Sequence, residues 1–232
     1  INLQDFGLLD GEPIAQNLDD IISVSEEMQT LKERIVKVAR TKSTVMIYGE
    51  TGTGKELVAR AIHNGGGRKN KRYLSQNCAA IPENLLESIL FGTTRGSFTG
   101  AENRPGLFEI ASGGTLFLDE INSMDLAVQA KILKAIEEQK IRRIGGTEDI
   151  LIDVRIIAAT NEDPLLCMQR GSLREDLYYR LKVVQLNIPP LRSRKEDIRP
   201  LTEYYINFYN TVMGKSIQNA DAQLMRLFYQ YS

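Results

Sequence analysis

The sequence lacks a strong net charge and any long apolar run. Its 29 Lys and Arg residues nearly balance its 30 Asp and Glu residues, which leaves a net charge of −1. This balance argues against a domain that binds nucleic acid through a strong overall positive charge. No apolar run reaches the roughly 18 residues that span a bilayer, and the N-terminus lacks the pattern of a signal peptide. We therefore expect no membrane partner.

Cysteine and histidine are also scarce. The two cysteines, Cys78 and Cys167, are far apart and fit no metal-ligand spacing, and the single histidine, His63, is interpreted as a structural cap. Buried, reduced thiols are typical of a cytosolic protein, so we expect a cytoplasmic location. The chain begins with Ile1 rather than Met, which favours a piece of a longer protein.

Short apolar runs alternate with helical patterns through most of the chain. Ser23 and Glu26 form a predicted capping box ahead of an amphipathic helix. The apolar runs predict strands at residues 45–48, 73–78, 116–118, 154–159 and 183–188. Because helical patterns lie between these runs, the sequence predicts an α/β fold with a five-stranded parallel sheet between helices.

The two ends of the chain differ from this core. The first residues show no clear period, which predicts a linker or arm. After residue 190, Ser193 and Glu196 form a second predicted capping box, an apolar helical repeat ends at Gly214, and another helix begins at Ala222. The predicted organisation is an arm at 1–17, a core at 18–190, and a small, truncated all-helical lid at 191–232.

A glycine-rich run follows the first strand and opens a helix. Its spacing, G-x-x-x-x-G-K, is that of a P-loop, where backbone N–H groups and a helix N-terminus surround phosphates and Lys55 reaches the outer ones. The alternative is a glycine-rich turn with an exposed lysine. Glu56 stands where Ser or Thr commonly holds Mg²⁺, so either other groups hold the metal or the subfamily does without the hydroxyl. The residues expected at the nucleotide are Gly49, Glu50, Thr51, Gly52, Thr53, Gly54, Lys55, Glu56 and Leu57.

Two carboxylates end the third apolar run. Asp119 and Glu120 would be costly at the tip of a buried strand unless they serve a cation or accept a proton. We expect Asp119 to organise Mg²⁺, directly or through water, and Glu120 to polarise the attacking water beside the metal. The alternative is a helix cap. Asn161 ends the fourth strand and is interpreted as a sensor of the γ-phosphate.

Taken together, these residues resemble the AAA+ ATPase domain of bacterial sigma-54-dependent transcription activators. The likeness covers about residues 18–198, and the phosphate loop is similar to the family's version, including Glu56. The most specific signal resembles the family's GAFTGA loop, which grips the sigma factor, with Ser97 in place of the usual Ala. This loop consists of Gly96, Ser97, Phe98, Thr99, Gly100 and Ala101. Its alternative is an ordinary turn with Phe98 buried.

The resemblance implies further roles. Arg174 and Arg180 would act as arginine fingers toward a neighbouring subunit's nucleotide, and Asn77 would pair with Glu120 and switch it. Ile22 and Ser23 lie where the family packs its adenine. The family's lid-sensor arginine and its DNA-reading helix-turn-helix have no counterpart in these residues, so DNA binding would rest on domains outside this sequence.

The function that the resemblance implies is that of a ring-forming ATPase. Such a hexameric motor would use ATP and Mg²⁺ to remodel sigma-54 RNA polymerase holoenzyme and open promoters. The residues Asn122-Ser123-Met124 are similar to those of arginine-utilisation regulators. Two alternatives are a different AAA+ machine, which the loop at 96–101 disfavours, and a nucleotide-binding regulator without catalysis.

Overall fold

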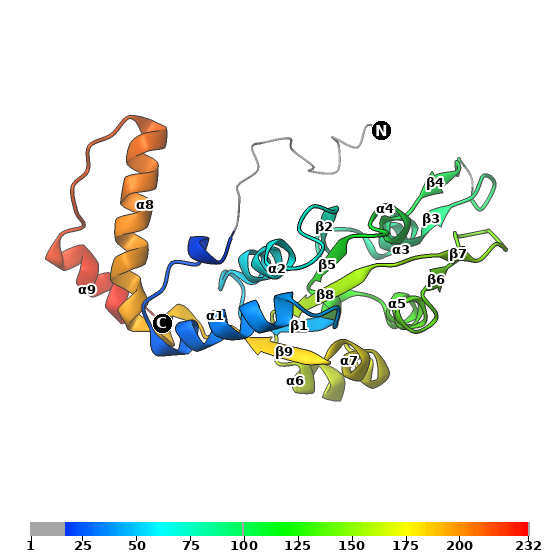
Figure 1. Cartoon of the computed structure of the whole chain (residues 1–232), viewed down its shortest axis with the longest axis horizontal. Coiled ribbons are helices and arrows are strands. Elements are labelled where there is room, and N and C mark those ends of the chain that lie inside the picture. The colour runs from blue at the N-terminus through cyan, green and yellow to red at the C-terminus, as the bar shows by residue number, and fades with distance from the viewer. Residues whose placement is uncertain (1–16, 99, 232) are drawn as a thin grey trace.

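The computed structural model describes residues 17–98 and 100–231. The predicted arm, residues 1–17, lies outside the described residues except for Asn17. Figure 1 shows an α/β core between two projections, a pair of hairpins at one end and two helices at the other. None of the described helices is long and apolar enough to cross a membrane.

The centre of the core is a five-stranded parallel sheet, as the sequence predicted. Its strand order is β2-β5-β8-β1-β9, and every pairing is parallel. The strands are β1 (Val45–Tyr48), β2 (Tyr73–Asn77), β5 (Thr115–Asp119), β8 (Arg155–Thr160) and β9 (Val184–Asn187). Because all five run the same way, their carboxyl ends meet at one edge, where ligands bind in open α/β sheets.

Helices cover both faces of this sheet because its strands are apolar on both faces. Along β1, Met46 joins one buried cluster while Val45 and Ile47 join the other, which follows from the alternation of side chains along a strand. The first cluster includes residues of α3 (Glu83–Phe91), α4 (Leu107–Ile110), α5 (Leu126–Glu138), α6 (Pro164–Gln169) and α7 (Glu175–Leu181). The second includes residues of α1 (Glu26–Ala39) and α2 (Lys55–Asn64).

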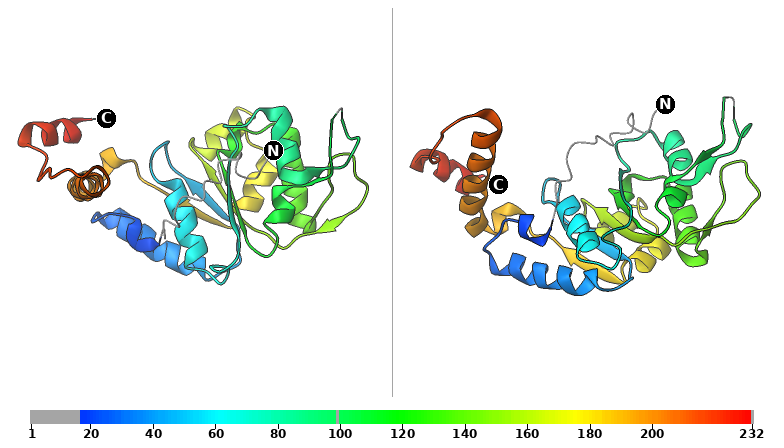
Figure 2. Two further views of the ribbon diagram at one scale, coloured as in Figure 1. Left: turned by 90° about the horizontal axis from the view of Figure 1, so that it is seen from above. Right: turned by 45° about the horizontal axis from the view of Figure 1, so that its top comes forward.

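Two short hairpins extend from the core and were not predicted from the sequence. One pairs β3 (Gly92–Thr93) with β4 (Arg104–Pro105), and the other pairs β6 (Lys140–Ile141) with β7 (Ile150–Leu151). Ile144 joins them, since its N–H donates to the Gly92 carbonyl and its carbonyl accepts from the Thr94 N–H, both at 3.0 Å. Both views in Figure 2 show the hairpins at the end of the core away from the C-terminal helices.

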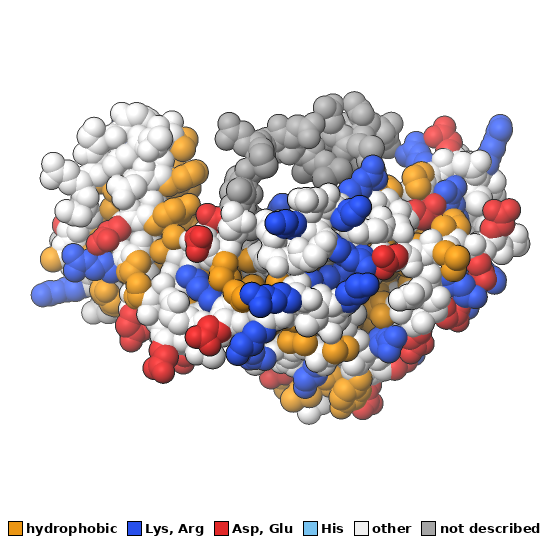
Figure 3. Space-filling model, in the orientation of Figure 1, with side chains coloured by type: hydrophobic (Ala, Val, Ile, Leu, Met, Phe, Trp, Pro, Cys, Tyr) orange, Lys and Arg blue, Asp and Glu red, His pale blue; other side chains and the backbone are white. Residues whose placement is uncertain are grey.

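The C-terminal helices are α8 (Ile198–Met213) and α9 (Ala222–Gln230), close to the predicted bounds. Gly214 ends α8 with φ of 62°, a left-handed conformation that glycine adopts at little cost. Figure 3 shows hydrophobic side chains along α8. The exposed residues of this helix include Tyr205, Phe208 and Val212.

Both predicted capping boxes are wrong. Ser25, not Ser23, occupies the N-cap of α1, and the Ser23 hydroxyl donates to the Ile21 carbonyl at 3.5 Å. Ser193 lies in a 3-10 turn, Leu191–Ser193, where its hydroxyl donates to the Pro190 carbonyl at 2.9 Å. A second turn, Lys195–Asp197, then leads into α8. In both cases the hydroxyl of the serine that the local pattern assigned to the cap donates to a backbone carbonyl outside the helix.

Candidate functional site

The predicted phosphate loop lies between β1 and α2, as expected. Gly52 and Gly54 have φ of 82° and 95°, so the loop turns through conformations that side chains disfavour. Gly49 is required for a different reason, because a Cβ there would lie 2.7 Å from the Thr53 hydroxyl oxygen and 3.1 Å from the Ile188 Cβ. The glycines therefore let the backbone curl tightly ahead of the α2 N-terminus, where N–H groups favour an anion.

Lys55 is folded over this loop. Its ammonium donates to the carbonyls of Gly49 and Glu50, at 3.0 and 3.2 Å, and the residue is only 6% exposed. The alternative of a glycine-rich turn with an exposed lysine is therefore wrong. A buried cation held by two neutral carbonyls is well placed to bind an anionic phosphate oxygen.

Asp119 ends β5 and Glu120 follows it, at the same edge of the sheet. Burial raises the pKa of the Asp119 carboxyl, the neighbouring Glu120 adds to this, and the positive charge of Lys55 opposes it. Glu120 has φ of 55°, a left-handed conformation that costs about 1–2 kcal/mol for a residue with a side chain. Such strain outside glycine is concentrated at functional sites.

The carboxylate pair also fits a magnesium ion that arrives with a nucleotide. Within the part of the chain that the structure describes, no three His, Cys, Asp or Glu side chains form a metal-binding group. Mg²⁺ is commonly held by one or two carboxylates together with substrate phosphates and waters, rather than by a protein cage. Asp119, beside Lys55 and the phosphate loop, is the residue that fits this role, with Glu120 next to it.

Asn77 and Asn161 both reach this edge. Asn77 pairs with Asp119 in the register of β2 and β5, but its carboxamide oxygen accepts from the N–H groups of Ala79 and Ala80 at 2.9 and 3.1 Å. Its bond to Glu120 stays a prediction. Asn161 follows β8, which lies next to β1 in the sheet. The predicted role of Asn161 as a γ-phosphate sensor requires these two strands to be neighbours.

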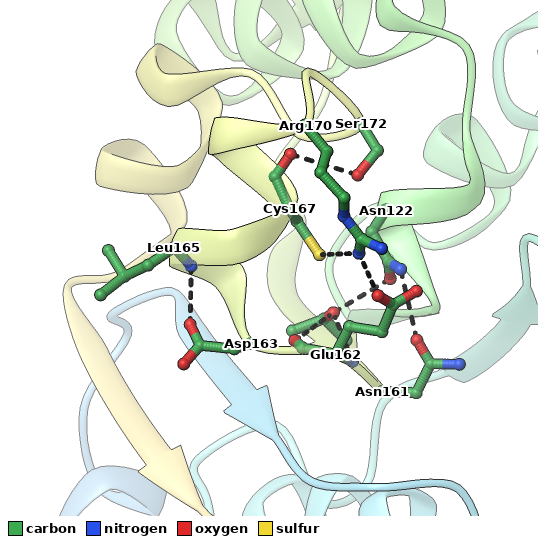
Figure 4. Close-up of polar contacts among 9 residues, drawn as sticks. Asn122, Asn161, Glu162, Asp163, Leu165, Cys167, Arg170 and Ser172 are labelled. Atoms are coloured by element: carbon green, nitrogen blue, oxygen red, sulfur yellow. Dashed lines mark hydrogen bonds and ion pairs between the residues drawn. The ribbon is translucent and has the colours of Figure 1, made fainter.

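Asn122 is a site residue that sequence reasoning missed. Its Nδ2 donates to the Asn161 Oδ1 at 3.2 Å, and its Oδ1 accepts from the Thr160 hydroxyl at 3.0 Å (Figure 4). It lies two residues after Glu120, so it links the carboxylates to the end of β8. The signal was its place two residues after the acidic pair.

The two candidate arginine fingers, Arg174 and Arg180, are at the two ends of α7, which covers the face of the sheet opposite α2. Arg174 lies at the N-cap of α7, and its guanidinium forms two hydrogen bonds with Asp176, at 3.0 and 2.6 Å. Arg180 is in the last turn of α7 and is exposed. Buried residues of α7 pack with α3, α4 and α5, whereas α2 packs with α1, which places both arginines away from the α2 face.

The predicted base-binding residues, Ile22 and Ser23, lie between a short 3-10 turn and α1. They are partly buried, and the Ser23 carbonyl accepts from the Gln29 side chain at 2.9 Å. Close to the start of α1 is an open cavity of about 570 Å³ that reaches the ends of β1 and β9. Its lining residues are Glu26, Glu27, Thr30, Tyr48, Asn187, Ile188, Pro189 and Pro190.

The loop at residues 96–101 leaves the first hairpin. Phe98 is 53% exposed, so the alternative of an ordinary turn with a buried Phe98 is wrong. Gly96 and Gly100 flank it with φ of 84° and 82°, while Thr99 lies outside the described residues. Ala101 is buried, and its N–H donates to the Phe98 carbonyl at 2.9 Å, which closes the base of the loop. The buried Ser97 hydroxyl has no hydrogen-bond partner among the described residues.

Comparison with known proteins decides between the families that share this geometry. The family described as the sigma-54 interaction domain matches residues 21–187. The chain belongs to this family. The alternative of a different AAA+ machine is thereby excluded for the core, and the predicted P-loop NTPase fold is confirmed by the sheet and by the structures below.

Named relatives of this sigma-54 domain include several regulators. The transcriptional activator RocR of Bacillus subtilis is 52% identical over 213 residues, which covers 92% of this chain and 46% of RocR. The similarity to RocR supports the subtype that the sequence predicted. The regulatory protein AtoC of Escherichia coli is 46% identical over 91% of this chain and 46% of AtoC. The chain therefore spans less than half the length of these two relatives.

Among solved structures, NtrX from Brucella abortus in complex with ADP has a TM-score of 0.85 and 36% identity. The match covers 91% of this chain and 47% of that one. NtrX in complex with ATP gives the same TM-score and identity. A protein that shares this fold, NtrX, has thus been solved with adenine nucleotides bound.

Proposed function

We propose that the chain is the ATP-hydrolysing motor of a sigma-54-dependent transcription activator. The observation that carries this proposal is the exposed Phe98, presented between two left-handed glycines on a hairpin that projects from a core with a phosphate loop. An apolar side chain half open to solvent on a small-residue loop suits contact with a protein partner. The proposed partner is the sigma-54 RNA polymerase holoenzyme.

The chemistry assigned to the site is hydrolysis of ATP. Lys55 would exchange its two carbonyl partners for phosphate oxygens, and Asp119 would hold Mg²⁺, which supplies charge neutralisation at the phosphates. Glu120 would polarise the attacking water, and Asn161, fixed by Asn122, would contact the γ-phosphate. The Gly49–Leu57 residues, Ile22 and Ser23 would bind the nucleotide.

The motor is proposed to work as a ring, with hexamers as the active assembly. Arg174 and Arg180 lie on the face of the sheet opposite α2, so we infer that they serve a neighbouring copy's nucleotide. Switching of Glu120 by Asn77 would pass the state of the nucleotide to the 96–101 loop. DNA binding is assigned to other domains of the full protein, and the proposed location is the cytoplasm. The division into a core, 18–190, and a lid, 191–232, stays a prediction.

The experiment that tests this function measures retention of sigma-54. Purified chain is mixed with sigma-54 in the presence of ADP and aluminium fluoride, which imitate the transferring phosphate. We expect the unmodified chain to retain sigma-54 and Phe98→Ala to lose it, while both hydrolyse ATP at the same rate. Val36→Ala, which shortens an exposed apolar side chain on α1, is the control and should behave as the unmodified chain. Undiminished retention by Phe98→Ala would contradict the proposal.

A further inference from the structure

Asp197 is a buried carboxylate for which the proposed chemistry has no use. It ends the turn Lys195–Asp197, directly before α8, and is 0% exposed. An ionised carboxylate in the interior is strongly unfavourable unless hydrogen bonds and opposite charge compensate its lost hydration. The partners of Asp197 therefore show what it holds in place.

Those partners come from a segment 172 and 173 residues earlier in the chain. Its Oδ1 accepts from the N–H groups of Val24 and Ser25, at 2.6 and 2.8 Å, and its Oδ2 accepts from the Ser25 hydroxyl at 2.8 Å. The guanidinium of Arg194, also buried, lies 3.4 Å from Oδ2. Burial alone would raise the pKa of this carboxyl, but these bonds and the charge of Arg194 hold the pKa below its usual value.

The Ser25 hydroxyl bonds to Asp197 instead of capping its own helix. Ser25 occupies the N-cap of α1, where a serine hydroxyl commonly accepts from the helix's own N–H groups. Here the hydroxyl makes no capping bond and donates to Asp197 instead. The short strap before α1, residues 21–25, is thus fixed from outside by the root of α8.

The strap is also the segment that carries Ile22 and Ser23, the proposed contacts of the base. Ile21 anchors its start in the core, and the Gln29 side chain holds the Ser23 carbonyl. The end of the strap is held by Asp197. Five residues before Asp197, Arg192 forms a two-point ion pair with Glu50 of the phosphate loop, at 2.6 and 2.5 Å. The segment that leads into α8 therefore contacts both proposed walls of the nucleotide site.

We propose that Asp197 is a positioning residue for nucleotide binding, which fixes the strap so that it can receive the nucleoside part of ATP or ADP. The inference rests on the proposed nucleotide site. It concerns the base end of that site, because the bonds of Asp197 go to Val24 and Ser25 rather than to the phosphate loop. Asp197 acts through the strap and does not touch the reacting atoms.

The test compares two probes, ADP and inorganic tripolyphosphate, each with Mg²⁺, by titration calorimetry. Both probes engage the phosphate loop, but only ADP has a nucleoside. Asp197→Asn removes the charge and places an amide beside Arg194. We expect it to weaken ADP binding about ten-fold or more, since charge-assisted hydrogen bonds are lost, and to leave tripolyphosphate affinity unchanged. Glu196→Gln makes the same charge change at an exposed neighbour and should alter neither affinity.

A second variant keeps the inference open to refutation if Asp197→Asn fails to fold. Ser25→Ala removes one of the bonds and leaves both backbone N–H groups on Asp197, so we expect about three-fold weaker ADP binding with unchanged tripolyphosphate binding. Equal losses for both probes, or unchanged ADP affinity in Ser25→Ala, would overturn the positioning role. If the unmodified chain binds neither probe, the proposed nucleotide site itself is wrong.

Discussion

At the scale of single residues, two backbone carbonyls hold the Lys55 ammonium in the proposed nucleotide site. Lys55 binds the carbonyls of Gly49 and Glu50, which keeps its buried charge hydrogen-bonded within the protein. Phosphate oxygens offer the same ammonium a negative charge, so the exchange favours the nucleotide. Glu120, beside Asp119, is held in a strained backbone conformation that its neighbours must maintain. Substitution of Lys55 should therefore affect nucleotide binding, and substitution of Glu120 should affect hydrolysis.

We expect Glu120→Gln to bind ATP as the unmodified chain does and to hydrolyse it about 10²–10⁴-fold more slowly, because the amide cannot accept a proton from water. Lys55→Ala removes the cation itself and should abolish nucleotide binding. Calorimetry with ATP and release of phosphate measure the two properties separately. Hydrolysis at the normal rate in Glu120→Gln, or normal ATP affinity in Lys55→Ala, would show that these roles are assigned wrongly.

The buried His63 should make the free energy of unfolding depend on pH. Its Nδ1 is 2.9 Å from the Thr115 hydroxyl, and burial together with the charges of Arg155 and Arg60 lowers the pKa of His63. Because the unfolded chain binds the proton more readily, stability present above about pH 6.5 is lost as the pH falls toward the folded pKa. The raised pKa of Asp119 acts in the opposite direction at lower pH.

Urea unfolding at pH 7.5 and 5.5 measures this loss. The free energy of unfolding should fall by about 1.4 kcal/mol for each pH unit between the two His63 pKa values. His63 is the chain's one histidine, so His63→Asn removes the titrating group and should flatten the difference. A difference that persists in His63→Asn would assign the effect to other groups.

At the scale of elements, the two hairpins act as one unit around the 96–101 loop. Gly145, in the turn of the second hairpin, has φ of 74° and lies against the first. A Cβ at this position would lie 2.6 Å from the Ser97 Cβ and 2.9 Å from the Thr94 hydroxyl oxygen. The close approach requires glycine and fixes the base of the loop that presents Phe98.

Gly145→Ala should therefore displace the 96–101 loop and abolish retention of sigma-54 with ADP and aluminium fluoride. ATP turnover should be unchanged, because the phosphate loop is built on a different part of the core. Gly214→Ala, which also places a side chain at positive φ but has no atom within 4 Å of the added Cβ, should retain sigma-54. Normal retention in Gly145→Ala would show that the two hairpins move independently.

The elements also show where sequence reasoning succeeds and where it stops. β1 and the phosphate loop were predicted closely because buried parallel strands are continuous apolar runs and the loop has a fixed spacing. The hairpins were missed because each of their strands has two residues, too few for a period. Ser23 was misassigned because the contact that decides the cap, between Ser25 and Asp197, spans 172 residues.

At the scale of the whole molecule, the proposed nucleotide site lies in the core, between the hairpins and the C-terminal helices (Figure 1). Figure 1 places the hairpins at one end and α8 and α9 at the other, with the sheet between them. The candidate fingers lie on the sheet face opposite α2, so a complete catalytic site would need a second copy. Their surroundings differ, because Arg174 is paired with Asp176 while the Arg180 guanidinium has no hydrogen bond or ion pair within residues 17–98 and 100–231.

This arrangement predicts that ATP turnover per chain rises with protein concentration, as copies assemble. Arg180→Ala should lose about 10³-fold or more in turnover, the scale of an arginine supplied in trans, and Arg174→Ala less, because Arg180 is the unpaired guanidinium. The decisive measurement mixes Arg180→Ala with Lys55→Ala. Each chain is inactive alone, but a Lys55→Ala neighbour can offer its intact Arg180 to the intact phosphate loop of the other. Recovery of turnover in the mixture supports fingers that act between copies, whereas a mixture as inactive as its components would place Arg180 in its own chain's site.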